Sequence, residues 1–172
     1  MADTPVEYSF LSKENFYQIV EEHLNNISKP DRSVITKEIA DQIIYLIENN
    51  FKDKSASDNL RRWARQFIIK NNNGRKFLYK QISRNHQKVE IFVCTKEEMY
   101  NVFCRIHNGD AGESHRGQNS TWHFINEQYC FIPQSISNTA CKACSVCCAS
   151  GIVRRIPEAY NNKKISSTRT GK

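Results

Sequence analysis

Two histidines, His107 and His115, stand upstream of four cysteines that crowd into eight positions. Two imidazoles and two thiolates make a closed, tetrahedral and electrically neutral site for Zn²⁺. Such a site contributes folding free energy directly, because the ligands come together only in the folded chain. The sequence therefore predicts one structural zinc ion. Both Cys141 with Cys144 and Cys144 with Cys147 have the Cys-x-x-Cys spacing that suits a shared metal ion.

The remaining composition favours metal binding over disulfides. The chain has seven cysteines, an odd number, and its first residues lack the order of a secretory signal peptide. No apolar run approaches the roughly 20 residues that cross a bilayer. We therefore expect a reducing compartment, cytosol or nucleus, with no membrane partner and no small-molecule substrate.

The first part of the chain has helical periodicity. Apolar side chains recur at helical spacing in Ser12–Asn25, Thr36–Asn50 and Ser57–Ile69. Three amphipathic helices can bury one another's apolar faces. We therefore predict a small helical N-terminal domain over residues 1–74.

After the break at Asn71–Gly74, the hydrophobic pattern of the sequence changes from helical spacing to alternation. Alternating patterns at Lys76–Ile82 and Lys88–Cys94 predict two strands of a β-hairpin. Thr95–Glu98 matches a capping box, and the helix that follows it carries His107 at its end.

Two further helices are expected before the basic end of the chain. One spans about 119–128, and another begins near Ser135 after Pro133 and ends in the cysteine cluster. The hairpin and these helices form a second domain over residues 75–150, and residues 151–172 are expected to be a basic, flexible tail. The fold class is thus mainly α with one β-hairpin.

Residues 77–147 resemble a known family, the His-His-Cys-Cys zinc-binding domain of retroviral, gypsy-like and Ginger-type transposon integrases. Host proteins derived from such integrases are similar. The chain departs from the family pattern at Ser114, Phe131 and Cys148, none of which is a ligand. The residues that carry the resemblance are Ile106-His107, His115-Arg116-Gly117, Thr121, Ile125, Tyr129 and the Cys-x-x-Cys end.

The resemblance implies a ligand set and a fold. The family's usual length after Tyr129 implies that Cys144 and Cys147 join His107 and His115, with Cys141 as the alternative to Cys147. It also implies a small three-helix, helix-turn-helix-like module that supports multimerisation and contacts DNA.

The resemblance does not imply catalysis. Integrases of this family continue into a core with two Asp and one Glu that bind catalytic Mg²⁺, whereas after Cys148 this sequence has one acid, Glu158. We expect a non-enzymatic protein of integrase origin. Two alternatives stay open: a protein-interaction adaptor that uses the N-terminal helices, and a partial product of a longer integrase.

A net charge of +7 and a pI near 9.1 suit DNA or another anionic partner, and with it a nuclear location.

Several individual side chains have simpler expected roles. We expect Arg61, Arg62 and Arg65 to form a solvated helix face and His123 to be exposed. Trp122, Phe124 and Tyr129 are expected in the core rather than as base-stacking platforms, and Cys94, Cys104 and Cys130 as buried thiols. The candidate DNA contacts are Arg116, Arg154, Arg155, Lys163 and Lys164.

Overall fold

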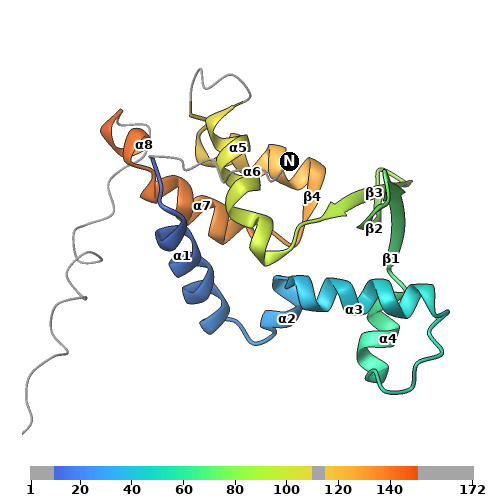
Figure 1. Cartoon of the computed structure of the whole chain (residues 1–172). Helices are drawn as coiled ribbons and strands as arrows, with labels where there is room; N and C mark the ends of the chain where they lie inside the picture. Colours follow the sequence, from blue (N-terminus) through green and yellow to red (C-terminus); the bar gives the residue numbers. More distant parts are fainter. Residues whose placement is uncertain (1–9, 110–114, 151–172) are drawn as a thin grey trace, which may run out of the picture.

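A computed structural model of the chain describes residues 10–109 and 115–150 (Figure 1). Its described part is mainly helical with one small sheet, which confirms the predicted fold class. The expected basic tail lies outside the described residues. The helices are α1 Lys13–Asn25, α2 Pro30–Ser33, α3 Lys37–Glu48, α4 Asp58–Ala64, the 3₁₀ turn Lys96–Glu98, α5 Met99–Asn108, α6 Gln118–Gln128, α7 Gln134–Ala143 and α8 Ser145–Ala149.

Polar side chains mark where the helices begin. The hydroxyl oxygens of Ser12, Thr36 and Ser57 each accept a hydrogen bond from the backbone N–H three residues on, at 3.2–3.3 Å. The predicted capping box is also present, because Glu98 accepts from the backbone N–H of Thr95 at 3.1 Å. These caps set the starts of α1, α3, α4 and the turn before α5.

The third predicted helix is wrong beyond Ala64. The helix ends there, and Phe67–Asn72 form a strand, β1, which pairs with β2 (Arg75–Arg84). A short apolar run such as Phe67-Ile68-Ile69 fits a strand as well as a helix. The turn decides between them: Asn73 and Gly74 have φ of +49° and +79°, as a tight two-residue hairpin requires.

The sheet is consequently larger than one hairpin. Strand β2 also pairs antiparallel with β3 (Gln87–Val93), which is the hairpin that the sequence predicted. A short strand, β4 (Tyr129–Cys130), adds in parallel to the end of β3. The order is β1-β2-β3-β4.

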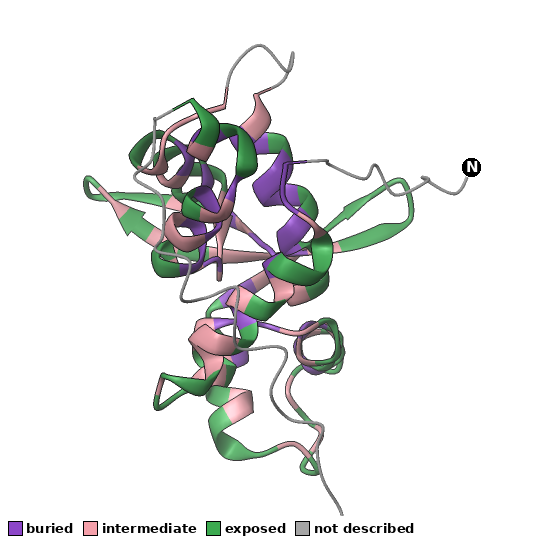
Figure 2. Cartoon of the chain, turned by 90° about the vertical axis from the view of Figure 1, so that its left-hand side faces the viewer, coloured by how far each residue is buried: buried purple, intermediate pink, exposed green. Residues whose placement is uncertain are grey.

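Buried residues, coloured purple in Figure 2, form two clusters, and each cluster contains residues from both before and after residue 74. The first, here named the zinc-side core, joins α1 to α5, α6, α7 and α8, and α1 packs on α7 and α5. The second, the sheet-side core, places α3 and α4 against one face of the sheet at Phe67, Leu78 and Val93. Of the three helices predicted to bury one another, α3 and α4 do pack together, whereas α1 packs in the other cluster.

Within the described ranges, no helix has both the length and the apolar character needed to cross a membrane.

Candidate metal centre

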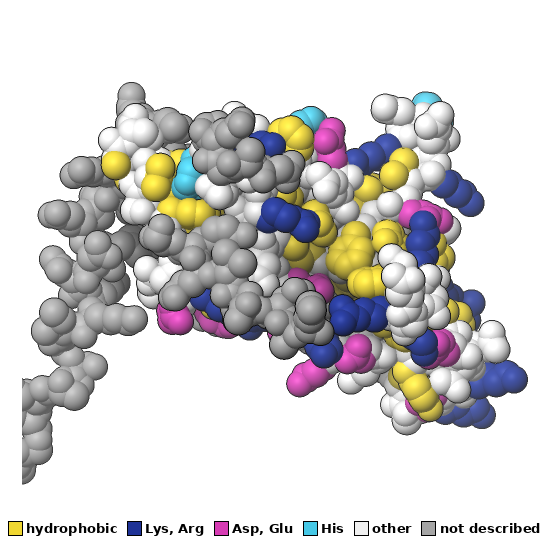
Figure 3. Space-filling view, turned by 45° about the horizontal axis from the view of Figure 1, so that its top comes forward, with side chains coloured by type: hydrophobic (Ala, Val, Ile, Leu, Met, Phe, Trp, Pro, Cys, Tyr) yellow, Lys and Arg dark blue, Asp and Glu magenta, His cyan; other side chains and the backbone are white. Residues whose placement is uncertain are grey.

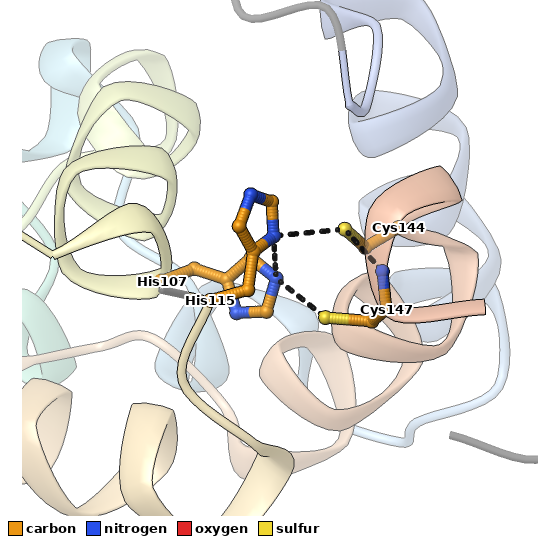
Figure 4. A group of neighbouring side chains, drawn as sticks. All are labelled: His107, His115, Cys144 and Cys147. Carbon is orange, nitrogen blue, oxygen red and sulfur yellow. Dashed lines mark hydrogen bonds between the residues drawn. The ribbon is translucent and has the colours of Figure 1, made fainter. Parts of the chain in front are cut away.

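The candidate metal site lies where the last helices meet the end of α5 (Figure 4). His107 is fully buried on the last turn of α5, and His115 is half-buried just before α6. Cys144 occupies the break between α7 and α8, and Cys147 lies one turn further on. Three separate segments thus supply four donor atoms.

The four donor atoms lie within 4.8 Å of one another. His115 Nδ1 is 3.1 Å from His107 Nε2 and 3.2 Å from Cys144 Sγ, and Cys147 Sγ is 3.4 Å from His107 Nε2. A tetrahedral Zn²⁺ with ordinary Zn–N and Zn–S bonds separates two nitrogens by about 3.3 Å, and a nitrogen from a sulfur by about 3.5 Å. These three distances therefore fit edges of one such tetrahedron.

A hydroxyl behind His107 fixes the orientation of its ring. Thr121 Oγ1, fully buried on α6, donates to the carbonyl of Arg116 at 3.1 Å and lies 3.2 Å from His107 Nδ1. Because the hydroxyl has one proton and gives it to Arg116, it accepts the proton of Nδ1–H. The Nε2 lone pair then faces the other three ligands, as metal-binding histidines require.

The position of Cys141 bears on the alternative ligand pair. Its sulfur lies 3.6 Å from His107 Nδ1, on the side of the ring that Thr121 occupies. Cys147 instead lies beside Nε2, and its backbone N–H donates to Cys144 Sγ at 3.4 Å. The structure thus brings together His107, His115, Cys144 and Cys147, with Cys141 behind the site.

Aromatic rings enclose the two histidines. Phe103 stacks on His107 with centroids 5.1 Å apart, and the edge of Phe10 meets His115 at 4.6 Å. The N–H of Ser145 donates to the carbonyl of Phe10 at 2.9 Å, which ties the chain before α1 to the start of α8. These contacts keep water from much of the site.

Burial also sets the protonation of the ligands. It lowers the pKa of His107 to about 4, with the nearby His115 adding to the effect, and lowers the pKa of His115. The same burial raises the pKa of the Cys147 thiol above its ordinary value. Both imidazoles are therefore neutral and ready to coordinate, whereas a metal ion must displace a thiol proton from Cys147.

The donor set fits zinc in a structural role. Two neutral imidazoles and two thiolates balance the charge of one Zn²⁺, and four protein ligands leave no position for a reactive water. A bound ion would join the end of α5, the start of α6 and the α7–α8 corner, which are the walls of the zinc-side core.

Among the predicted DNA contacts, Arg116 is half-buried. Its guanidinium donates to the carbonyl of Ile106 and lies 4.4 Å above the ring of Phe124. Arg154, Arg155, Lys163 and Lys164 lie outside the described residues.

Other predicted residues have mixed outcomes. His123 is exposed beside Glu127, as predicted, and Cys94 and Cys104 are buried. The prediction of a core position is wrong for Phe124, which is 37% exposed and has the Arg116 guanidinium over its ring.

Sequence reasoning assigned no role to two residues that support the site. Thr121 was part of the family pattern, but its bond to His107 depends on how α6 packs on α5. Phe10 lies 97 positions before His107 in the sequence and no spacing rule connects it to the site.

Comparison with known proteins gave no match to a family model, a curated protein or a solved structure. The resemblance to integrase zinc domains therefore remains an expectation from the residue pattern.

Proposed function

We propose that His107, His115, Cys144 and Cys147 hold one structural zinc ion, and that the zinc-stabilised module binds DNA as a non-catalytic relative of integrase zinc domains. The observation that carries the proposal is the close approach of four donor atoms, within 4.8 Å of one another, in the order His-His-Cys-Cys. No other set of the described residues offers such a site.

DNA is the partner that the charge of the chain favours. A net charge of +7 attracts a phosphate backbone at long range, and phosphate contacts supply most sequence-independent affinity. Arg116 leads into α6, and Lys142 is exposed on α7, the helix that packs against α6. Nuclear location and self-assembly belong to the same proposal.

Metal content tests the zinc site. Purified protein is expected to contain one zinc ion per chain by mass spectrometry of the metal. Cys147→Ser removes a ligand and should lower zinc retention sharply during dialysis against a chelator. Cys141→Ser is the matched control, since its sulfur lies behind His107, and should retain zinc. Folded protein without zinc would overturn the assignment.

Gel-shift titration tests DNA binding. The full chain, loaded with zinc, is expected to retain duplex DNA at low salt and to release it progressively as salt rises. Light scattering on the same sample reports self-assembly. Folded, zinc-loaded protein that retains no DNA at low salt would reject DNA binding and favour a protein-interaction adaptor.

A further inference from the structure

The second face of the sheet carries a row of apolar and aromatic side chains that crosses all four strands. Ile68, Tyr79 and Phe92 are register partners on β1, β2 and β3, and Phe92 pairs with Tyr129 on β4. Residues directly opposite one another on neighbouring strands share a face. Phe77, two positions from Tyr79, lies on the same face because side chains alternate along a strand.

These rings contact one another, and among them Tyr129 alone packs against a buried core. The centroid of Phe92 is 5.4 Å from that of Tyr79, 5.7 Å from Tyr129 and 5.8 Å from Phe77. Phe77, Tyr79 and Phe92 belong to neither buried cluster, and all are half-buried. The sheet-side core uses the opposite face, so this face retains aromatic surface that folding does not bury.

Cations surround the row. On the strands of this face, Lys70, Arg75 and Lys88 are set against one carboxylate, Glu90, which is paired with Lys70. Lys70 Nζ also lies 4.7 Å above the ring of Tyr79. On one face of the molecule, Figure 3 shows hydrophobic side chains gathered between Lys and Arg side chains, with some Asp and Glu side chains among them. The charge is complementary to a polyanion.

Two adjoining hollows extend this face toward the zinc side. One, of about 410 Å³, is lined by Tyr79, Phe92 and Tyr129. It is also lined by two carboxylates, Glu90, which is paired with Lys70, and Glu127, which lies 3.2 Å from His123. The other, of about 430 Å³, shares Tyr129 and contains Arg105 and Arg116. Arg105 also lies 5.9 Å over the ring of Tyr129. An aromatic floor thus continues into a site with two guanidinium groups.

We propose that this face, named here the aromatic sheet face (Ile68, Phe77, Tyr79, Phe92 and Tyr129), binds single-stranded DNA. Bases would stack on Tyr79 and Phe92, while Lys70, Arg105 and Arg116 contact phosphates. Stacking needs unpaired bases, which a duplex does not offer, so rings interleaved with cations favour a single strand. The choice of DNA rests in part on the proposed function. The single-strand preference rests on the sheet alone.

Fluorescence anisotropy with zinc-loaded full-length protein tests this proposal. The probes are a labelled DNA oligonucleotide, its duplex and the RNA strand of the same sequence. Wild-type protein is expected to bind the single DNA strand more tightly than the duplex. Tyr79→Leu and Phe92→Leu keep apolar volume but remove the ring, so each should weaken single-strand binding about tenfold and leave duplex binding unchanged.

Tyr45→Leu is the matched control, because Tyr45 is an aromatic residue 53% exposed on α3, which packs on the opposite side of the sheet. It should bind like the wild type, and zinc content and thermal melting verify that every variant is folded. Unchanged single-strand binding in both leucine variants would overturn the proposal, as would stronger binding of RNA. Self-association that these two variants abolish would assign the face to a second copy of the chain. If duplex binding persists without single-strand binding, the aromatic sheet face fails while the proposed function stands.

Discussion

At the residue scale, Thr121 is the side chain that orients His107. Its hydroxyl links Nδ1 of the ring to the carbonyl of Arg116, the residue that follows His115. The two histidine segments are also joined directly, since the N–H of Arg116 donates to the carbonyl of His107 at 2.8 Å. One buried hydroxyl therefore sets both the tautomer of a ligand and the approach of the second.

Thr121→Ala should weaken zinc binding about 10-fold to 100-fold, because loss of a histidine's outer partner frees its ring. It should also destabilise the protein by about 1–3 kcal/mol through an unsatisfied buried Nδ1–H. Competition with a chromophoric chelator measures the first effect, and urea unfolding the second. Ser120→Ala, exposed on the same helix, is the control. Wild-type zinc affinity in the Thr121 variant would refute this role.

His107 makes stability depend on pH. Its pKa is lowered to about 4 by burial and by His115, whereas an unfolded histidine titrates near its ordinary pKa of about 6.5. The unfolded chain therefore binds the proton more readily, so the stabilisation is complete above about pH 6.5 and is lost as the pH falls toward about 4. Bound zinc acts in the same direction, because it needs neutral imidazole.

Urea unfolding between about pH 7 and about pH 5 should show this loss as a falling midpoint. Replacing the exposed His123 with Gln is the control and should leave the profile unchanged. A midpoint that stays constant over this range would contradict the buried, neutral state of His107.

At the scale of elements, two tight turns build the sheet. Asn73-Gly74 joins β1 to β2, and Asn85-His86, with φ of +48° and +64°, joins β2 to β3. Both turns have positive φ at their two central residues, as the right-handed twist of the flanking strands favours. Because β2 is the centre of the three long strands, both turns determine which side chains face the helices.

Gly74→Ala should destabilise the sheet-side core by about 1 kcal/mol, because alanine is strained at a φ of +79°. A Cβ at this position would meet nothing within 4 Å, so the cost is conformational rather than steric. Gly117→Ala is the control, since its Cβ is equally unobstructed and its φ is −64°. Urea unfolding with zinc content as a second readout compares the two variants, and equal stability would contradict this reason.

At the scale of the whole molecule, α1 belongs to the zinc-side core although it is distant in sequence from the ligands. Phe16 and Val20 of α1 are fully buried in that cluster, and Tyr100 of α5 donates its hydroxyl to the carbonyl of Leu11 at 2.7 Å. In Figure 1, α1 lies beside α7 on the same side of the sheet as α5 and α6. A metal ion bound to these four ligands would therefore be coupled to α1 through the zinc-side core.

Removal of zinc should loosen α1 together with α5–α8, while α3, α4 and the sheet keep more of their structure. The reason is that the metal joins walls of the zinc-side core only. Hydrogen exchange with and without chelator measures the protection of each segment. Retained protection of α1 after zinc loss would show that α1 is not coupled to the metal.

The sequence predicted local features well where a short pattern has one physical meaning. Residues close together in the sequence determine the capping box at Thr95–Glu98, the helix that ends near His107 and the β2–β3 hairpin. Prediction failed at Phe67–Asn72, because a run of three apolar residues fits a helix and a strand equally well. The pairing of this segment with β2 makes it a strand. It also failed for Phe124, which lies on the exposed side of α6 with Arg116 over its ring.

The residue types and their order determined the candidate ligands, because two histidines and two cysteines provide a closed and neutral zinc site. Tertiary structure decided what the order left open. It placed Cys147 beside His107 Nε2 and Cys141 beside Nδ1, brought Thr121 behind the ring, and packed α1 against the metal side. The physical reason is separation along the sequence. Caps and hydrogen bonds between residues a few positions apart are determined by the local sequence, whereas contacts between remote segments depend on how all the helices pack together.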